Sequence, residues 1–195
     1  MPRKIFIWSA HPKPGSLSEH LADAYQDAAI ANGAEVRRMN LSDMDFADNF
    51  TGYRDAPALE PDLQAWQSAI SWADHLMFIH PYWWGAMPGR AKTVLDRVLV
   101  PGFAYKYRPN GLSWDKLLAG KTGDAVITSD TPPLYDTLIY RRPARRVIRN
   151  QVFGFCGVKT RNVVQFGTVK TAKPEKIAKW ARQMAKLGAQ AATSK

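Results

Sequence analysis

Cysteine is nearly absent from this sequence, and so are long hydrophobic runs. With Cys156 as the one cysteine, no disulfide can form within the chain and no group of cysteines can hold a metal, which indicates a reducing compartment. The longest apolar run near the amino terminus is residues 5–8, far short of the ~20 residues that cross a bilayer. We therefore expect a cytoplasmic protein that is not inserted in a membrane.

The motifs of the common nucleotide and metal sites are also missing. Neither G-x-G-x-x-G nor G-x-x-x-x-G-K-[ST] occurs, which argues against a dinucleotide-binding Rossmann unit and a P-loop nucleoside triphosphatase. His20, His75 and His80 lack the spacing of metal ligands, so we interpret them as cap, surface or core residues and predict no metal site. Cys156 follows Phe155 and precedes Val158, which favours buried packing over a reactive thiol.

What is present is the composition of a globular protein with an excess of positive charge. The 195 residues are 46% hydrophobic and 23% charged, which predicts one domain over residues 1–195. Lys and Arg number 27 against 17 Asp and Glu, a net charge of +10. Many of the basic residues fall into two clusters: Arg141, Arg142, Arg145, Arg146 and Arg149, and Lys176, Lys179, Arg182 and Lys186. We interpret both as solvated faces, with a binding patch as the alternative.

Short apolar runs alternate with longer segments of helical period, which is typical of a parallel sheet covered by helices on both faces. Strands are predicted at residues 5–8, 35–39, 76–79, 125–128 and 162–166. Helices are predicted at residues 17–28 with a stop at Asn32–Gly33, from Pro61 to Ala73, from Pro88 to Leu99, over 135–155 with a bend or break at Pro143, and from Pro174 to Leu187. The fold class is therefore α/β: a doubly wound, five-stranded parallel sheet, with the strand at 35–39 near an edge.

In such sheets ligands bind outside the carboxyl ends of the strands, where the strand order reverses. Three loops at these ends are candidates: residues 11–18, 80–85 and 128–135. The first offers hydroxyls and free amides at a helix N-terminus, which favours a phosphate, although an ordinary N-cap by Ser16 or Ser18 explains it equally well.

The second candidate loop carries three aromatic residues, Tyr82, Trp83 and Trp84, directly after an apolar strand. Each indole can bury ~150 to 250 Å², so these side chains are expected to cover something. One interpretation is a core or dimer contact. The other is a wall for a planar conjugated ring, with main-chain amides directed at its polar edge.

Several groups of residues together resemble one family. They are His11 with Ser16–Ser18, the run Pro81–Pro88, and Asp96–Val98 leading to Pro101–Tyr105, and Phe155–Gly157 also fits. Their order and spacing across residues 4–190 resemble the flavodoxin-like NAD(P)H:quinone oxidoreductases of the DT-diaphorase type. The resemblance implies a flavodoxin-like fold, bound FMN or FAD, NAD(P)H as co-substrate, a quinone acceptor, and a homodimer with the site at the subunit interface. No second nucleotide-binding segment is visible, which favours FMN over FAD.

The resemblance also implies roles for individual residues. The flavin phosphate would be held by His11, Ser16, Leu17 and Ser18. The isoalloxazine ring would be lined by Pro81, Tyr82, Trp83, Trp84 and Gly85, and its pyrimidine edge by Thr128, Ser129 and Thr131. Tyr135 matches the catalytic tyrosine that hydrogen-bonds the reduced ring. Tyr105 and Tyr107 would reach into the partner's pocket and face nicotinamide or quinone, with packed loop tyrosines as the alternative.

The third loop departs from the family pattern. Asp130–Thr131 stands where the family has a Gly–Gly pair, which puts the backbone contacts to the flavin in doubt, and Arg141 or Arg142 lies where a histidine is usual. The implied mechanism is ping-pong: hydride passes from NAD(P)H to flavin N5, NAD(P)⁺ leaves, and the quinone is then reduced, with the protein supplying orientation and electrostatics. Tyr135, loop amides and an arginine would stabilise negative charge at flavin N1/O2.

Two alternatives come from other function classes. Relatives with this fold serve as regulatory flavoprotein subunits that dock on a transporter. A nucleic-acid binder is suggested by charge alone, and no recognition motif supports it, so we predict no nucleic-acid partner. For the arginine cluster at residues 141–149, the 2′-phosphate of NADPH is an alternative to solvation or a dimer contact.

Overall fold

The structure is a computed structural model that describes residues 1–53, 57–109 and 111–194. Its strands and helices, in chain order, are β1 (Lys4–Ser9), α1 (Leu17–Ala31), β2 (Glu35–Asn40), η1 (Leu41–Asp43), α2 (Pro61–Trp72), β3 (His75–Pro81), α3 (Gly89–Val98), β4 (Tyr105–Tyr107), β5 (Trp114–Lys116), β6 (Thr122–Thr128), α4 (Pro133–Leu138), α5 (Pro143–Arg146), η2 (Val147–Gly154), β7 (Lys159–Phe166), η3 (Val169–Thr171) and α6 (Pro174–Thr193). The segment η2 is a π-helix that continues α5.

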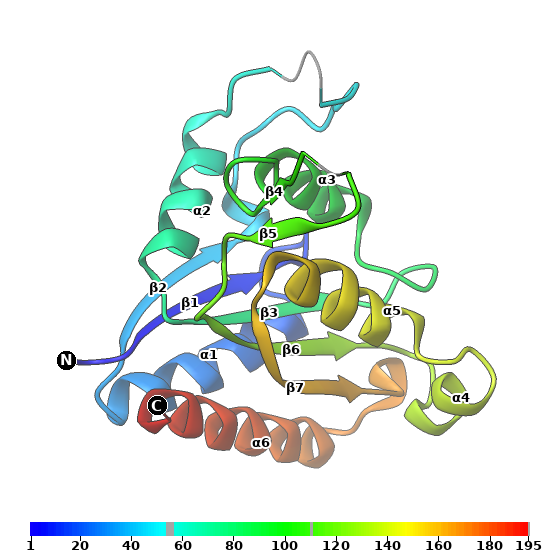
Figure 1. The fold of residues 1–195 in the computed structure, drawn as a ribbon. Coiled ribbons are helices and arrows are strands. Elements are labelled where there is room, and N and C mark those ends of the chain that lie inside the picture. Colours follow the sequence, from blue (N-terminus) through cyan, green and yellow to red (C-terminus); the bar gives the residue numbers. More distant parts are fainter. Residues whose placement is uncertain (54–56, 110, 195) are drawn as a thin grey trace.

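The main sheet has five parallel strands in the order β2-β1-β3-β6-β7, which confirms the predicted fold class (Figure 1). The chain runs outward from β1 to β2, returns to β3 on the other side of β1, and then continues to β7. The strand order therefore reverses between β1 and β3, and the loops that follow these two strands leave the sheet on either side of this point. The strand β2 lies at an edge, as predicted.

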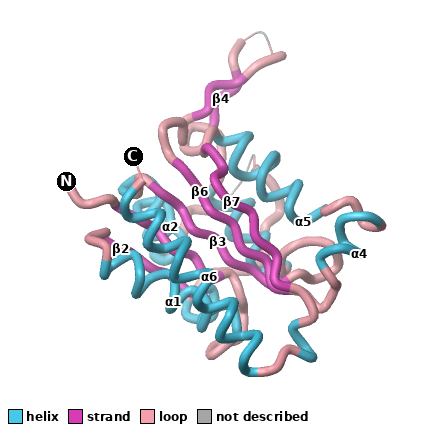
Figure 2. The backbone as a smooth tube through the Cα atoms, turned by 90° about the horizontal axis from the view of Figure 1, so that it is seen from below, coloured by secondary structure: helices cyan, strands magenta, loops and turns pink. Residues whose placement is uncertain are grey.

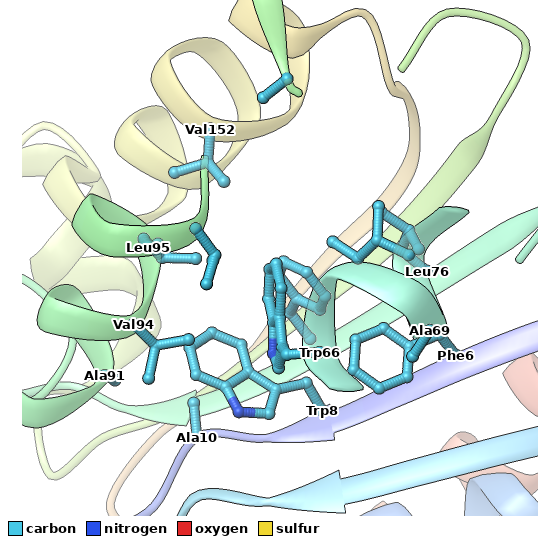
Figure 3. Close-up of a cluster of buried hydrophobic side chains, with 14 of the residues drawn as sticks. Phe6, Trp8, Ala10, Trp66, Ala69, Leu76, Ala91, Val94, Leu95 and Val152 are labelled. Carbon is cyan, nitrogen blue, oxygen red and sulfur yellow. The ribbon is translucent and has the colours of Figure 1, made fainter. Parts of the chain in front are cut away.

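Helices cover both faces of this sheet, with α1 and α6 on one face and α2, α3 and η2 on the other (Figures 1 and 2). Because side chains alternate along a strand, Ile5 and Ile7 pack toward α1 and α6, whereas Phe6 and Trp8 pack toward α2. On that second face Trp66 meets Phe6 and Trp8 edge to face, with ring centroids 5.7 and 5.3 Å apart (Figure 3). Burial on both faces explains why the strand β1 is continuously apolar.

A buried polar cluster ties α1 to the amino-terminal half of the sheet. The Tyr25 hydroxyl donates to Asp124 Oδ2 at 3.0 Å and lies 3.0 Å from His75 Nε2. Burial opposes the charge on Asp124, but hydrogen bonds from His75, Asn162 and Tyr25 outweigh burial and lower the pKa of this carboxyl. His75 is therefore a core residue, as is His80, whereas His20 is exposed.

The structure departs from the predicted elements in one region and confirms a break in another. Residues predicted as loop form an antiparallel hairpin of β4 and β5, whose three-residue strands are too short to produce a readable alternation. The predicted helix over 135–155 is interrupted before Pro143, as expected.

Cys156 is buried at 3% exposure, as predicted, and burial raises its pKa to about 11. In the part of the chain that the structure describes, no helix is long and apolar enough to span a membrane.

A close contact between α1 and α6 provides a stability test. A Cβ added to Gly188 in α6 would lie 2.1 Å from the Tyr25 carbonyl oxygen in α1. Gly188→Ala must push the two helices apart, so we expect a loss of ~2 to 3 kcal/mol in the free energy of unfolding, measured by urea denaturation. The matched control is Gly89→Ala, because a Cβ there meets nothing within 4 Å. Equal effects of the two substitutions would contradict this packing.

The buried histidine at the end of β3 predicts a pH dependence. His80 is 2% exposed, its Nδ1 donates to the Pro81 carbonyl at 2.8 Å, and burial lowers its pKa to about 4. The unfolded chain takes up this proton near its ordinary pKa, so stability is lost as the pH falls from about 6.5 toward 4. Between pH 7.5 and pH 5 the loss should be ~2 kcal/mol. Urea midpoints of His80→Leu should vary less over this range, whatever its stability at pH 7.5.

Candidate functional site

Loops that follow neighbouring strands converge at the carboxyl end of the sheet. The Tyr82 N–H donates to the Thr128 carbonyl at 2.8 Å, and the Ser129 N–H donates to the Phe166 carbonyl at 2.8 Å. The loops enclose a hollow of about 180 Å³. It is lined by His11, Leu17, Ser18, Pro81, Tyr82, Trp83, Thr128, Ser129, Asp130 and Val169.

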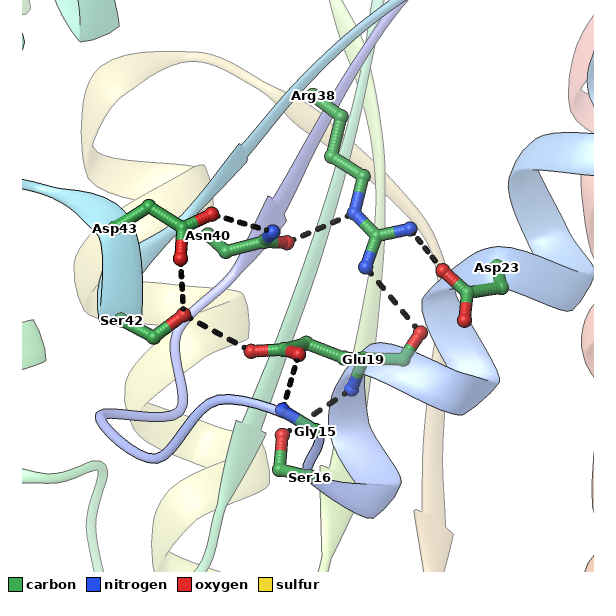
Figure 4. A network of polar contacts seen from close by, with 8 residues as sticks. All are labelled: Gly15, Ser16, Glu19, Asp23, Arg38, Asn40, Ser42 and Asp43. Atoms are coloured by element: carbon green, nitrogen blue, oxygen red, sulfur yellow. Dashed lines mark hydrogen bonds and ion pairs between the residues drawn. The ribbon is translucent and has the colours of Figure 1, made fainter.

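The loop after β1 leads into α1, where two backbone amides have no acceptor in the described part of the chain. Ser16 is the N-cap, as one of the two predicted alternatives, and its Oγ accepts the Glu19 N–H at 3.3 Å. Glu19 accepts the N–H of Gly15 at 2.7 Å, outside the helix (Figure 4). The N–H groups of Leu17 and Ser18 lie in the first turn of α1, where the helix has no earlier carbonyl that could accept them. These two amides and the helix dipole favour an anion in the hollow that both residues line.

Residues from β2 and η1 hold this loop in place. The Ser42 Oγ lies 3.0 Å from Glu19 Oε1, and Arg38 donates from Nη2 to the Glu19 carbonyl at 3.4 Å (Figure 4). Arg38 also donates to Asn40 and is ion-paired with Asp23. The Glu19 carboxylate is thus fixed by neighbours on both sides, and the loop is shaped before any ligand binds.

The aromatic loop after β3 is a strained tight turn. Trp83 and Ala86 exchange N–H···O bonds of 2.9 and 3.0 Å, and both central residues have positive φ, +50° at Trp84 and +82° at Gly85. Such turns favour Asn–Gly, and positive φ is costly for a tryptophan. The Trp84 side chain is also fully exposed, at 104%. Both features cost free energy in the isolated chain, which indicates a constraint imposed by function.

A buried carboxylate joins the aromatic loop to α5. The Tyr82 hydroxyl donates to Asp136 Oδ1 at 3.0 Å, and Arg145 Nη2 donates to Asp136 Oδ2 at 2.8 Å. Asp136 is 1% exposed. Burial and the bond to Asp136 raise the pKa of Tyr82 to about 12, so its hydroxyl keeps its proton well into the alkaline range. The sequence did not single out Asp136, because one acidic residue in a helical segment resembles an ordinary surface charge.

Eight of the predicted site residues line the hollow, and others lie at its margin. Those that line it are His11, Leu17, Ser18, Pro81, Tyr82, Trp83, Thr128 and Ser129. Ser16 caps α1 and is 8% exposed, and Trp84 and Gly85 form the tip of the aromatic turn. The Thr131 carbonyl accepts the Ser129 Oγ–H at 2.9 Å.

The predicted tyrosines lie elsewhere on the same chain. Tyr135 is half-exposed on α4, next to Asp136, with its ring edge to face with Tyr140 at 5.1 Å. Tyr105 and Tyr107 lie on β4, where the Tyr105 ring contacts those of Tyr107 and Phe155 at 5.2 and 4.9 Å. Tyr105 lines a separate hollow of about 260 Å³ between α3 and η2. That Tyr105 and Tyr107 face nicotinamide or quinone in the partner's pocket stays a prediction that needs a second copy of the chain, and the catalytic role of Tyr135 also stays a prediction.

The loop after β7 also contributes to the hollow, although it is not among the three loops predicted from the sequence. The Lys170 N–H donates to Asp130 Oδ1 at 2.7 Å, and the Val169 N–H donates to the Ser129 carbonyl at 3.1 Å. A Cβ at Gly167 would lie 2.6 Å from the Thr131 carbonyl, so this position needs glycine for close approach. The rule that sites form at the carboxyl ends of strands applies equally to the last strand, and would have found Val169.

Comparison with curated proteins finds relatives of modest identity. An uncharacterized NAD(P)H oxidoreductase of Escherichia coli K12 is 29% identical over 60% of this chain, which spans 65% of that relative, less than two thirds of its length. An uncharacterized NAD(P)H oxidoreductase of Haemophilus influenzae is 26% identical over 82% of this chain and 81% of its own length. An ancillary protein of a glutathione-regulated potassium-efflux system, from Enterobacter, is 27% identical over 69% of this chain and 70% of its own length.

Solved structures share the fold closely. An NAD(P)H:quinone oxidoreductase from Methanothermobacter marburgensis superposes with a TM-score of 0.80 at 19% identity, covering 97% of this chain and 98% of that one. An FMN-dependent NADH-azoreductase from Bacillus anthracis, in complex with FMN, has a TM-score of 0.71 at 16% identity over 98% of this chain and 100% of its own. A sequence model of the flavodoxin-like fold family matches residues 3–187. The chain therefore belongs to the family of proteins with the flavodoxin-like fold.

Proposed function

We propose that this chain binds a flavin, FMN in preference to FAD, and is an NAD(P)H:quinone oxidoreductase. The observation that carries this proposal is that the anion-binding start of α1 and the strained aromatic turn after β3 open on the same hollow. A phosphate site beside an indole wall is what a flavin mononucleotide requires at its two ends. The relatives named NAD(P)H oxidoreductase and the FMN-bound structural neighbour support the same assignment.

The donors of the described chain fit this cofactor. The amides of Leu17 and Ser18 and the hydroxyl of Ser18 would hold the phosphate, with Ser16 and His11 beside them. The pKa of His11 is lowered, chiefly by burial, which favours the neutral imidazole at this position. Pro81, Tyr82 and Trp83 would line the ring, with Trp84 and Gly85 closing over it. The loop with Thr128, Ser129 and Thr131 would face its polar edge.

The protein's part in the chemistry is orientation and charge. The flavin supplies hydride transfer when bound. Tyr82 is neutral at neutral pH, and burial together with its hydrogen bond to Asp136 raises its pKa further, to about 12, so it acts as an uncharged wall. The charge of the Asp136 carboxylate is compensated by Arg145. Tyr135 would donate its hydroxyl toward negative charge on the reduced ring. A small hollow that takes nicotinamide and acceptor in turn implies that the oxidised nicotinamide leaves before the quinone enters, which is a ping-pong sequence.

A homodimer would complete this site. Tyr107 is 57% exposed on β4 and is not among the described residues that line the two hollows given above. The hollow between α3 and η2 is lined largely by apolar residues, among them Leu95, Leu99, Val147 and Val152. Association through this face would cover apolar surface and bring Tyr105 and Tyr107 toward the partner's ring.

The reductase proposal predicts colour and a kinetic pattern. The purified protein should take up FMN, lose the flavin absorbance on addition of NADPH without air, and regain it when a quinone is added. Initial rates at several quinone concentrations should give parallel double-reciprocal lines, as a ping-pong sequence requires. A protein that takes up neither FMN nor FAD contradicts the proposal. Uptake of flavin with only incidental turnover would instead favour a regulatory subunit, the role suggested by the name of the potassium-efflux relative.

The strained tryptophan gives a test in which stability and binding move in opposite directions. Trp84→Asn places the residue that such turns prefer at the first central position, so the free energy of unfolding should be unchanged or higher by up to ~1 kcal/mol. The dissociation constant of FMN, measured by fluorescence quenching, should rise ~10-fold because the indole contact is lost. Ile30→Ala removes another exposed apolar side chain, on α1, and should leave FMN binding unchanged. Unaltered FMN affinity in Trp84→Asn would remove Trp84 from the site.

A further inference from the structure

The arginines between residues 141 and 149 form a concave surface beside the edge strand β7. They line a hollow of about 490 Å³, which is within the ~300 to 1,000 Å³ of small-molecule sites. The lining residues are Thr137, Arg141, Arg142, Arg145, Arg146, Arg149, Asn150 and Val163, and we call this hollow the arginine groove. The basic residues of α6 differ, because Lys176, Lys179, Arg182 and Lys186 are exposed on one helix and form the solvated face that was predicted.

Positive charge in the arginine groove is largely uncompensated. Arg145 is ion-paired with Asp136, whose other oxygen is taken by Tyr82. For the other four arginines, no carboxylate partner exists among residues 1–53, 57–109 and 111–194. Arg142 and Arg146, like Arg145 and Arg149, are four residues apart, a spacing at which like charges destabilise a helix by ~0.2 to 0.5 kcal/mol per pair. A bound anion would relieve this repulsion.

The backbone that carries two of these arginines is strained. Arg141 and Arg142 both have positive φ, +61° and +58°, with no glycine in the turn between α4 and α5. Left-handed conformation costs ~1 to 2 kcal/mol per residue that has a Cβ. The Arg142 N–H donates to the Asp136 carbonyl at 3.0 Å, which fixes the turn against the same residue that binds Arg145. Strain of this kind persists at ligand sites, where the surrounding structure imposes it.

Two contacts place the arginine groove next to the hollow of about 180 Å³ at the carboxyl end of the sheet, which we call the cofactor hollow. Tyr82 lines the cofactor hollow, Arg145 lines the groove, and both are bound to the carboxylate of Asp136. At the tip of the aromatic turn, a Cβ on Gly85 would lie 3.9 Å from Pro143 Cγ, the first residue of α5. A molecule whose one end lies on the aromatic wall can therefore reach the groove with its other end.

We propose that the arginine groove binds the 2′-phosphorylated ADP end of NADPH and makes the site selective for NADPH over NADH. This inference rests on the proposed reductase function. Guanidinium groups match phosphate oxygens in bidentate pairs, and several of them together suit a ligand with several phosphates. Rossmann sites that select NADH place a carboxylate on the ribose hydroxyls, where it would repel a 2′-phosphate. Among the described residues that line the arginine groove there is no carboxylate. The 2′-phosphate of NADPH would thus pair with arginines of the groove, whereas NADH, which has no 2′-phosphate, would leave these arginines without an anionic partner.

The test separates phosphate recognition from net charge and from flavin chemistry. Calorimetric titration with adenosine 2′,5′-bisphosphate and with 5′-AMP needs no bound flavin. The unaltered protein should bind the bisphosphate at least 10-fold more tightly than 5′-AMP. The double variant Arg146→Gln/Arg149→Gln should lose this preference, and both side chains are exposed, so the fold should persist. Lys179→Gln/Arg182→Gln on α6 removes the same charge and should bind both nucleotides as the unaltered protein does.

Steady-state kinetics extend the test to the holoenzyme. In the groove variant, KM for NADPH should rise at least 10-fold, KM for NADH should rise by a smaller factor because NADH lacks the 2′-phosphate, and kcat should stay within twofold of the unaltered enzyme. Equal binding of the two nucleotides by the unaltered protein overturns the proposal, as does equal loss in both double variants. Loss of RNA affinity in the groove variant with bisphosphate binding intact also overturns it and indicates a polyanion surface. Selective bisphosphate binding without quinone reduction would refute the reductase function and leave the nucleotide site in place.

Discussion

Burial of both faces of one parallel sheet is the constraint on which the rest of this structure depends. Every residue of β3 is buried, and the aromatic side chains of β1 interlock with Trp66 of α2 on one face while aliphatic ones meet α1 and α6 on the other. Parallel strands covered in this way must all end at the same edge. The loops that follow β1, β3, β6 and β7 are therefore brought together by the core, without any attraction of their own.

Conformational strain and unpaired groups collect at that edge. Trp84, Arg141 and Arg142 have positive φ, and the amides at the start of α1 have no acceptor among the described residues. The opposite half of the sheet holds the Tyr25, His75 and Asp124 cluster, in which hydrogen bonds satisfy the buried groups. The core and this cluster stabilise the fold, so the edge can tolerate conformations that cost free energy and that serve binding.

Much of the fold could be predicted because its signals are local. The apolar run at residues 5–8, the helical period from Leu17 to Ala28 and the stop at Asn32–Gly33 each follow from neighbouring residues, and all three match the structure. The hairpin of β4 and β5 could not be predicted, since three-residue strands carry too little periodicity. Ser16 as N-cap and the position of the three candidate loops could be predicted for the same reason. Val169 follows from the rule that sites form at the carboxyl ends of strands, but only when the rule is applied to the last strand as well.

The sequence by itself determined the layered α/β architecture, the strand at the edge, the aromatic turn and the basic clusters, because periodicity, turn residues and charge are written in consecutive positions. Only the tertiary structure decided that Asp136 is buried between Tyr82 and Arg145. It also decided that the arginines at residues 141–149 line a hollow whereas the basic residues of α6 face solvent, and that Tyr105 and Tyr107 are not among the residues that line the hollow at the carboxyl end of the sheet. These features depend on contacts between segments distant along the chain. Such contacts arise only when the sheet fixes where each loop ends.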